Sequence, residues 1–461
     1  MGAADRITSS AVVHTAPDGA ISGPAPSSGM QAYRASVLHF TGDPVFEANA
    51  HHWHEDGLLI VADGHVVVAG DFTLLQPTLP TGVQWQDHRG KIICPGFIDT
   101  HTHYSQTDII ASPAAGLLPW LEKYTFPAEE KFADSDHAAE VARFFLDELL
   151  ANGTTTAMVY CTVHVASVEA LFAESAARNM RMAAGKVLMD RHCPQSLRDT
   201  AEQGARDTEK LIRRWHKQGR QLYAITPRFA PTSSEAQLRL AGELANTWPD
   251  TLIQSHVAEN ADEISWAQSL FPAARSYLDV YDRAGLLRKR ALYGHCIWLD
   301  DADRQRMVET GAAVAMCPTS NLFLGSGLFD VTAADRAGMQ LSLATDVGGG
   351  TSFSMFRTMD ALYKVARLGG SHVSALRLFY FATLGGARAM GLEGVVGNFA
   401  PGTEADFLIL DARVTPLLAR RSAQSQTLEE LLFVLALLGD DRSVAATYVA
   451  GSLLHARSGA C

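Results

Sequence analysis

The sequence lacks a long hydrophobic run and has a deficit of positive charge. Its longest uninterrupted apolar stretch, Leu431 to Leu438, is shorter than half of the roughly 20 residues that a membrane-spanning helix needs. The 38 Lys and Arg residues stand against 50 Asp and Glu residues, which gives a formal net charge of -12. Because this charge repels phosphate backbones and anionic lipid surfaces, we expect neither a nucleic acid nor a membrane as partner.

Cysteine is sparse, and its spacing indicates no disulfide framework. The six cysteines are widely scattered and form no C-x-x-C pair, and most of them lie in apolar, strand-like surroundings. Such thiols are typical of reduced core residues, which favours a cytoplasmic location. The first 34 residues also lack the basic start and the continuous apolar segment of a secretory signal, so we expect a mobile extension there.

Several catalytic signatures are absent as well. The glycine-rich runs GSGLF and DVGGGTS are not followed by the Lys-Ser/Thr of a phosphate loop and are not set in a dinucleotide fingerprint. The chain has no G-x-S-x-G nucleophile elbow, and it lacks the H-x-E and P-C-x-x-C signature of cytidine deaminases. These absences leave the histidines and carboxylates as the candidate chemical groups.

Two kinds of segment follow one another along the chain. Residues 35–94 and 396–461 carry short strand-like runs separated by tight turns, such as Asp63-Gly64 within LLIVADGHVVVAG. We expect these two distant segments to form one small β-sandwich. Residues 95–395 instead alternate apolar strand candidates with helical stretches, the pattern of a parallel sheet with crossover helices.

Eight strand candidates lie in this central segment, and they begin near residues 96, 154, 180, 222, 251, 291, 312 and 341. One of the spacers between them, DHAAEVARFFLDELLANG, has an acidic start, an apolar face with a period of 3.6 residues, and Gly153 where a C-cap glycine belongs. Eight strands with helical spacers predict an α/β fold of the (β/α)8 TIM barrel type.

Residues suited to metal binding follow several of these strands. The first strand ends in His101 and His103, the fifth in His256, the sixth in His295 and the eighth in Asp346. Active sites of (β/α)8 barrels lie at the C-terminal ends of the strands, and residues i and i+2 of a strand point to the same side. We therefore expect one metal ion per subunit. Three of these imidazoles together with the carboxylate suit Zn²⁺, and Fe²⁺ accepts the same donors.

A simpler explanation exists for each of these features. A lone H-x-H pair is more often a hydrogen-bonded surface feature than a ligand pair, but here further donors fall on strands that were placed by hydrophobicity alone. Glu259 follows the fifth strand, and Arg228 and Phe229 end the fourth. The HHWH run at 51–54 is expected to be solvated, and His164 is as easily a structural histidine as a pocket residue.

Eight blocks are distinctive: PGFIDTHTHYSQTD, LPWLEKYTFPAEEKF, KVLMDR, ITPRFAPTSS, SHVAEN, HCIWL, CPTSNLFLGSGLF and TDVGGGTS. Together they resemble the guanine deaminases, a family of the amidohydrolase superfamily, and the resemblance runs from about residue 35 to 455. The scattered metal ligands are shared by the whole superfamily, whereas the stretch from Trp120 to Phe132 and the Arg228-Phe229 pair are typical of the guanine-specific branch.

The resemblance implies a role for each candidate residue. It implies that four strand-end residues bind Zn²⁺: His101, His103, His256 and Asp346. It implies that Glu259 carries protons and that His295 assists at the metal-bound water. It implies that three residues hold the purine: Gln106, Arg228 and Phe229. It also implies a homodimer, which nothing in the composition indicates.

The expected reaction is the hydrolytic deamination of guanine to xanthine and ammonia. Zn²⁺ would lower the pKa of a bound water, Glu259 or Asp346 would take its proton, and Glu259 would protonate the ring nitrogen beside the attacked carbon. An alternative is a related amidohydrolase acting on cytosine, a triazine or another aminopurine. A structural protein that has lost the metal is a further alternative, but it would require gaps in the ligand set, and this sequence has none.

Overall fold

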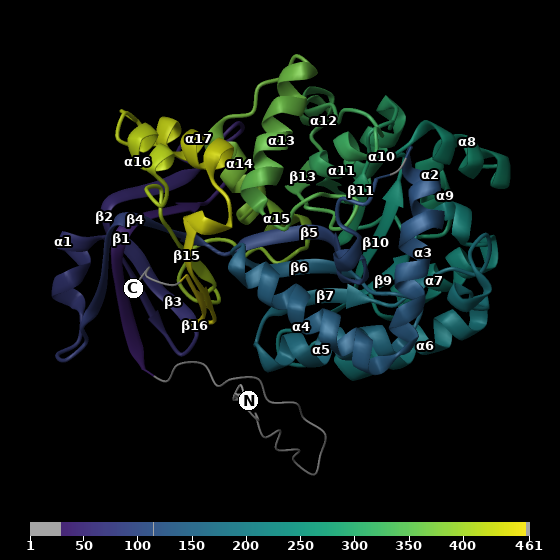
Figure 1. Ribbon diagram of the computed structural model, residues 1–461, viewed down its shortest axis with the longest axis horizontal. Coiled ribbons are helices and arrows are strands. Elements are labelled where there is room, and N and C mark those ends of the chain that lie inside the picture. Colours follow the sequence, from purple (N-terminus) through teal and green to yellow (C-terminus); the bar gives the residue numbers. More distant parts are fainter. Residues whose placement is uncertain (1–28, 114, 458–461) are drawn as a thin grey trace, which may run out of the picture.

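The computed structural model describes residues 29–113 and 115–457. It contains a near-closed barrel of eight parallel strands beside a second sheet that is built from both ends of the chain (Figure 1). The predicted (β/α)8 barrel with a two-ended β unit is therefore confirmed. None of the helices in the described ranges combines the length and the apolar character that a bilayer span requires.

The barrel strands coincide with the eight predicted ones. Neighbouring strands are parallel in the order β13, β12, β11, β10, β9, β7, β6, β5, and a short β8 pairs with β9. Every residue of β6 is buried, because both faces of a parallel barrel strand are covered. The bounds are β5 (Phe97–His103), β6 (Thr154–Tyr160), β7 (Arg181–Gly185), β8 (Val187–Leu188), β9 (Leu222–Pro227), β10 (Leu252–Val257), β11 (Ala291–His295), β12 (Ala313–Met316) and β13 (Gln340–Leu343).

The barrel closes where its last strand meets its first. Just beyond β13, the backbone N–H of Asp346 donates to the carbonyl of His101 over 2.9 Å, and the N–H of His103 donates to the carbonyl of Val347 over 2.7 Å. The buried carboxylate of Asp99 accepts from the backbone N–H of Thr345 at 3.0 Å. These bonds bring the end of β5 against the segment that carries Asp346.

Helices cover the outside of the barrel. Helix α4 begins after Asp134, whose carboxylate accepts from the backbone N–H groups of Asp136 and His137, and it is followed by Gly153 with a φ of 82°. The predicted cap glycine is thus confirmed. The barrel helices are α2 (Leu117–Trp120), α3 (Phe126–Glu130), α4 (Ser135–Ala151), α5 (Val165–Ala177), α6 (Ala201–Trp215), α7 (Glu235–Thr247), α8 (Ala261–Leu270), α9 (Tyr277–Arg283), α10 (Asp301–Thr310), α11 (Pro318–Phe323), α12 (Val331–Ala337), α13 (Met355–Leu368), α14 (Ala375–Phe381) and α15 (Leu384–Ala389). Short 3₁₀ or π turns are η1 (Gln76–Thr78), η2 (Tyr104–Ile109), η3 (Leu121–Thr125), η4 (Lys131–Ala133), η5 (Gln195–Leu197), η6 (Ala230–Thr232) and η7 (Asp441–Ser443).

The second sheet combines strands from both ends of the chain in the order β16, β15, β14, β4, β1, β2, β3. It begins at Met30, so residues 30–34 belong to the sheet and not to the extension expected at 1–34; residues 1–28 lie outside the described residues. The strands are β1 (Met30–Phe40), β2 (His51–Ala62), β3 (His65–Asp71), β4 (Trp85–Pro95), β14 (Phe407–Leu410), β15 (Val444–Val449) and β16 (Ser452–Ala456), and the added helices are α1 (Phe72–Leu75), α16 (Pro416–Ser422) and α17 (Leu428–Leu438).

This sheet curls around a core of its own. The N–H of Val66 donates to the carbonyl of Thr403 over 2.8 Å, which joins the β2–β3 hairpin to the segment before β14. Inside the curl, the rings of Tyr33, Phe407 and Tyr448 pack together, with 4.3 Å between the centroids of Phe407 and Tyr448. The two layers of the expected sandwich are therefore parts of one continuous sheet.

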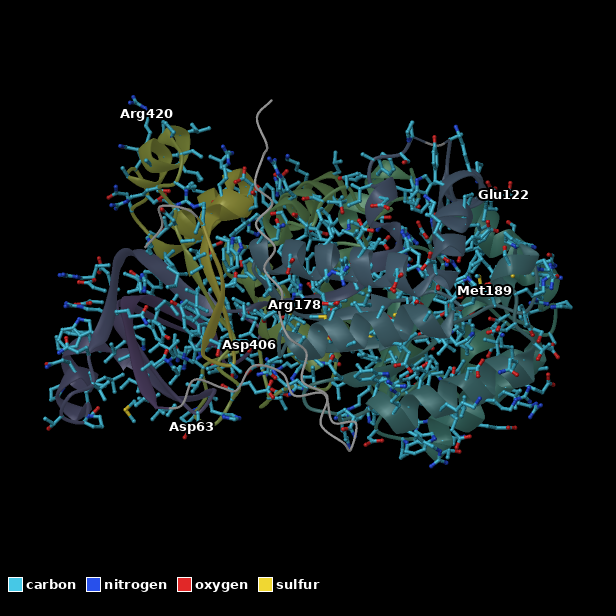
Figure 2. All side chains as sticks on the ribbon, turned by 60° about the horizontal axis from the view of Figure 1, so that its bottom comes forward. Asp63, Glu122, Arg178, Met189, Asp406 and Arg420 are labelled. Atoms are coloured by element: carbon cyan, nitrogen blue, oxygen red, sulfur yellow. The ribbon has the colours of Figure 1, made fainter. Side chains whose placement is uncertain are left out.

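A buried cluster of charges joins the sheet to the barrel. Arg220, in the turn before β9, places Nη2 at 2.6 Å from a carboxylate oxygen of Asp406 and at 2.7 Å from one of Glu404. Arg181 at the start of β7 also pairs with Glu404. Asp406, labelled in Figure 2, additionally accepts from the backbone N–H of Ala450 at 2.8 Å. The cluster thus holds the bottom of the barrel against the start of β14.

Removing Arg220 tests whether this cluster fastens the two units. Arg220→Met leaves the buried carboxylate of Asp406 and the partly buried one of Glu404 with one guanidinium, and breaking a buried pair in this way typically costs about 3–5 kcal/mol. We expect a clear fall in the midpoint of urea unfolding, followed by circular dichroism. Arg239→Met is the matched control, because its pair with Glu243 is exposed and is expected to contribute less than about 1 kcal/mol. Equal midpoints for the two variants would show that the cluster does not stabilise the junction.

Candidate metal centre and active site

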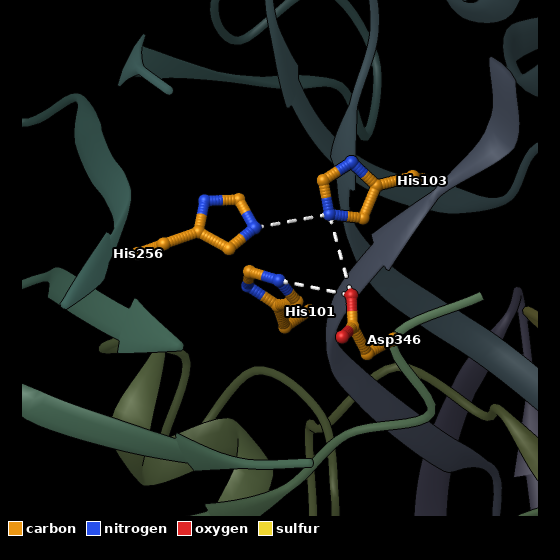
Figure 3. Close-up of side chains that lie close together, drawn as sticks. All are labelled: His101, His103, His256 and Asp346. Carbon is orange, nitrogen blue, oxygen red and sulfur yellow. Dashed lines mark hydrogen bonds and ion pairs between the residues drawn. The ribbon is translucent and has the colours of Figure 1, made fainter. Parts of the chain in front are cut away.

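Four side chains at the C-terminal end of the barrel converge on one point. Their ligand atoms, three imidazole nitrogens and a carboxylate oxygen, all lie within 4.8 Å of one another: His101, His103, His256 and Asp346. Asp346 Oδ1 lies 3.2 Å from His101 Nε2 and 3.3 Å from His103 Nε2, and His256 Nε2 lies 3.2 Å from His103 Nε2 (Figure 3). The group could hold a metal ion.

The backbone at the strand ends turns these side chains inward. His101 and His103 occupy alternate positions of β5 and so face the same side. His295 ends β11 with a φ of 69°, and Asp346 follows β13 with a φ of 51°. Positive φ is uncommon in residues other than glycine, and such conformations cluster at functional sites. Local strain thus accompanies the convergence.

Hydrogen bonds on the far side of two imidazoles fix which nitrogen faces the centre. His256 Nδ1 lies 2.7 Å from the carbonyl of Arg228, and His295 Nδ1 lies 2.9 Å from Asn321 Oδ1. An N–H at Nδ1 donates to each of these oxygens, so the neutral ring presents its Nε2 lone pair to the centre. This arrangement is typical of metal-binding histidines.

Burial keeps the imidazoles of His103 and His256 neutral. It lowers the pKa of His103 to about 3, although the neighbouring Asp346 opposes this shift. Burial, followed by the nearby His101 and His103, lowers the pKa of His256 well below its ordinary value. Burial alone would raise the pKa of Asp346, but contacts with His101 and His103 hold it well below its usual range. Neutral imidazoles and an ionised carboxylate are the forms that bind a cation.

Glu259 and His295 lie beside this centre. His295 Nε2 is 3.4 Å from Glu259 Oε2 and 3.8 Å from Asp346 Oδ2. Glu259 Oε1 accepts a hydrogen bond from Ser326 Oγ over 2.8 Å. Burial, and then the charge of Asp346, raise the pKa of Glu259 to about 8. A carboxyl group with this environment is suited to carrying protons near neutral pH.

One pocket contains almost all of the candidates from the sequence. Gln106, Arg228 and Phe229 line it together with Glu259, and His101 lies beneath its surface. The remaining candidates in its lining are His103, His256, His295 and Asp346. An apolar wall is added by Leu117, Trp120, Leu121 and Leu324. By contrast, His164 and residues 51–54 are absent from this lining and from the possible metal-binding groups of the described residues.

Several polar residues of the site were not found from the sequence. Glu129, in the block from Trp120 to Phe132, is fully buried, and both of its oxygens lie 2.8 Å from Arg228 Nη1. Asn321 in α11 contacts His295, and Ser326, just after this helix, donates to Glu259. Glu263 caps α8 and accepts from the backbone N–H of Glu259 at 3.0 Å. Glu129, Asn321 and Ser326 lie within the conspicuous blocks, whereas the sequence signal for Glu263 is its place three residues after Asn260, the spacing of a capping box.

The chain is similar in sequence to the amidohydrolase family and to a known guanine deaminase. A model of the amidohydrolase family matches residues 92–454. The guanine deaminase of Escherichia coli (strain K12) is 46% identical over 432 residues, which cover 93% of this chain and 98% of that protein.

Solved structures agree with this relationship. The structure of E. coli guanine deaminase superposes with a TM-score of 0.89 at 45% identity and covers 93% of this chain and 100% of that chain. The structure of guanine deaminase from C. acetobutylicum, with bound guanine in the active site, superposes with a TM-score of 0.82 at 28% identity, with the same coverage of both chains. Because both the family model and the E. coli relative span most of the sequence, the chain belongs to the amidohydrolase family, in its guanine deaminase branch.

Proposed function

We propose that the chain hydrolyses guanine to xanthine and ammonia and that this reaction depends on one Zn²⁺ per subunit. The observation that carries the proposal is a single pocket that combines a possible metal-binding group with Arg228 and Gln106 as hydrogen-bonding groups. The similarity to guanine deaminases, one of which holds guanine in its active site, supports the choice of substrate.

The donor set fits a zinc ion. His101, His103 and His256 would supply three nitrogens and Asp346 one oxygen, which is a common set for Zn²⁺ and one that Fe²⁺ also accepts. His256 directs its Nδ1–H toward the carbonyl of Arg228, so its Nε2 lone pair, 3.2 Å from Nε2 of His103, is available to a cation. When bound, the metal supplies a Lewis acid that makes water nucleophilic near neutral pH.

Glu259 and His295 would move the protons of the reaction. As the water oxygen bonds to C2 of guanine, Glu259 takes a proton from the water and delivers it to the adjacent ring nitrogen. The proton of the new C2 hydroxyl group then passes to the 2-amino group, the C2–N bond to this group breaks, and ammonia leaves while C2 becomes a carbonyl. His295, when protonated, donates from Nε2 to the attacking oxygen, because Asn321 already accepts from Nδ1.

Arg228 would select the purine. Guanine presents a carbonyl oxygen at position 6, where adenine presents an amine, and a guanidinium can only donate. Arg228 is buried, so adenine would leave a donor facing another donor without water. Gln106 and Phe229 line the same pocket and would complete the contact with the ring.

The proposal extends to location and assembly. We place the enzyme in the cytoplasm, since all five cysteines within the described ranges are buried and form no disulfide: Cys94, Cys161, Cys193, Cys296 and Cys317. The net charge of -12 supports a small-molecule substrate and opposes binding to nucleic acid or anionic membranes. The homodimer that the sequence resemblance implies stays a prediction.

Turnover of guanine is the direct test of this function. The purified protein with one equivalent of Zn²⁺ is expected to convert guanine to equal amounts of xanthine and ammonia, measured by ultraviolet absorbance and an ammonia assay. The same assay with cytosine, a triazine and adenine tests the alternatives. Ammonia release from one of these at a higher kcat/KM than from guanine would overturn the assignment.

Glu259→Gln separates proton transfer from metal binding. The variant keeps every proposed ligand, so we expect full zinc content but a loss of about 10²–10⁴-fold in kcat. His101→Ala is the contrasting variant, because it removes a ligand, and both its zinc content and its activity should fall. Metal content is measured by mass spectrometry. Near-normal turnover by Glu259→Gln would show that Glu259 does not carry the protons. Full zinc occupancy in His101→Ala would show that His101 is not a metal ligand.

Arg228→Ala tests the origin of selectivity. Sites that rely on a buried hydrogen bond reject the wrong analogue by about 10⁴-fold, so wild-type activity on adenine should be negligible beside that on guanine. The variant should lose most of its kcat/KM for guanine, while its small activity on adenine changes little. If the two values fall by the same factor, Arg228 is a scaffold residue held by Glu129 and does not read the ring.

A further inference from the structure

Glu129 connects two of the groups proposed to hold the substrate. It lies in α3, its side chain is 0% exposed, and both of its oxygens are 2.8 Å from Arg228 Nη1. Glu129 Oε1 also lies 3.3 Å from Gln106 Nε2, which donates to it. Arg228 is itself only 3% exposed. A single buried carboxylate therefore fixes both side chains from behind.

These contacts decide what the wall of the pocket can still offer a ligand. Arg228 has Nη1 engaged by Glu129, so its other N–H groups remain for a ligand. Gln106 uses its Oε1 to accept from the backbone N–H of Gly348 at 3.2 Å, and Nε2 has one further N–H to donate. The wall formed by Arg228 and Gln106 thus presents donors, which match carbonyl oxygens and unprotonated ring nitrogens.

The same pair also sets the charge of this wall. The negative charge of Glu129 compensates the guanidinium at hydrogen-bond distance, and both side chains are almost fully shielded from water. Without Glu129, Arg228 would be a buried, uncompensated cation facing the ligand, and such a charge favours an anion strongly.

We propose that Glu129 is a positioning residue that makes Arg228 an electrically compensated donor, so that the pocket binds the uncharged guanine ring and does not retain ionised xanthine. This inference rests on the proposed function. Deamination replaces the 2-amino group by a carbonyl and adds an N–H at the adjacent ring nitrogen, N3, which lies beside that electron-withdrawing carbonyl, so xanthine loses a proton at lower pH than guanine. Charge therefore distinguishes product from substrate on this wall.

Other titratable groups face the pocket, and they must be unchanged in any variant that is compared with the wild type. Those in its lining are His103, His256, His295, Glu259, Glu263 and Asp346. Tyr160 and Cys193 also lie within electrostatic range of Arg228. Because Glu129→Gln leaves all of these in place, the ratio of the variant to the wild type at each pH isolates the contribution of the carboxylate.

The test is inhibition by xanthine, measured against guanine at a series of pH values that spans the ionisation of xanthine. Glu130→Gln is the matched control: it makes the same chemical change in the next residue, which is exposed and contacts Ser196. In Glu129→Gln we expect kcat/KM for guanine to fall about tenfold or more, and xanthine to bind about tenfold more tightly than to the wild type where it is ionised. Where xanthine is neutral, this tightening should be absent. Glu130→Gln should follow the wild type.

Three results would overturn the inference. The first is equal weakening of guanine and xanthine in Glu129→Gln at every pH, which describes a scaffold residue; the second is a variant that behaves as the wild type. The third needs no variant: xanthine binding to the wild type that strengthens about tenfold as xanthine ionises. Calorimetric titration with xanthine measures this binding without turnover. A protein that is inactive on guanine would therefore refute the proposed function, whereas the inference about Glu129 is tested by the xanthine titration alone.

Discussion

Closure of the barrel between its first and last strands is the constraint on which the site depends. Asp346 is separated from His101 and His103 by most of the barrel sequence, yet its Oδ1 lies 3.2 Å and 3.3 Å from their Nε2 atoms. The backbone bonds between the end of β5 and the segment after β13 impose this proximity. Asp99 reinforces it from within, because its carboxylate accepts from the N–H groups of His101 and Thr345. Three of the four proposed metal ligands are therefore placed by the same hydrogen bonds that close the fold.

Charge balance gives the site a second organising rule. The pocket and its surroundings bury four carboxyl groups, on Glu129, Glu259, Glu263 and Asp346, around one guanidinium, that of Arg228. Burial and neighbouring carboxylates raise the pKa of Glu259 to about 8 and that of Glu263 to about 7. A divalent cation at the histidines would compensate part of this excess, while Glu129 compensates Arg228. The end of the pocket with the histidines and carboxyl groups thus needs a cation, whereas the end with Arg228 needs the carboxylate of Glu129.

The features that can be predicted from the sequence are those encoded in short segments, such as strands and ligand pairs on one strand. Strands such as β6 are buried on both faces and appear as continuous apolar runs, and a ligand pair on one strand shows as H-x-H with a period of two. Sequence reasoning did not find Glu129, which meets Arg228 from 99 positions away, because no periodicity marks a long-range ion pair. It also placed the start of the sheet too late. Residues 30–34 become a strand through pairing with residues 58–62 of β2, and half-exposed Gln31 and Arg34 interrupt their apolar pattern.

The most direct test of this account is anomalous X-ray scattering from crystals of the zinc-loaded protein, recorded on both sides of the zinc absorption edge. The account predicts one strong zinc peak per chain, about 2.0–2.2 Å from a nitrogen of His101, His103 and His256 and from an oxygen of Asp346. A peak at another position, such as the histidines at 51–54, with no zinc at the strand ends, would contradict it.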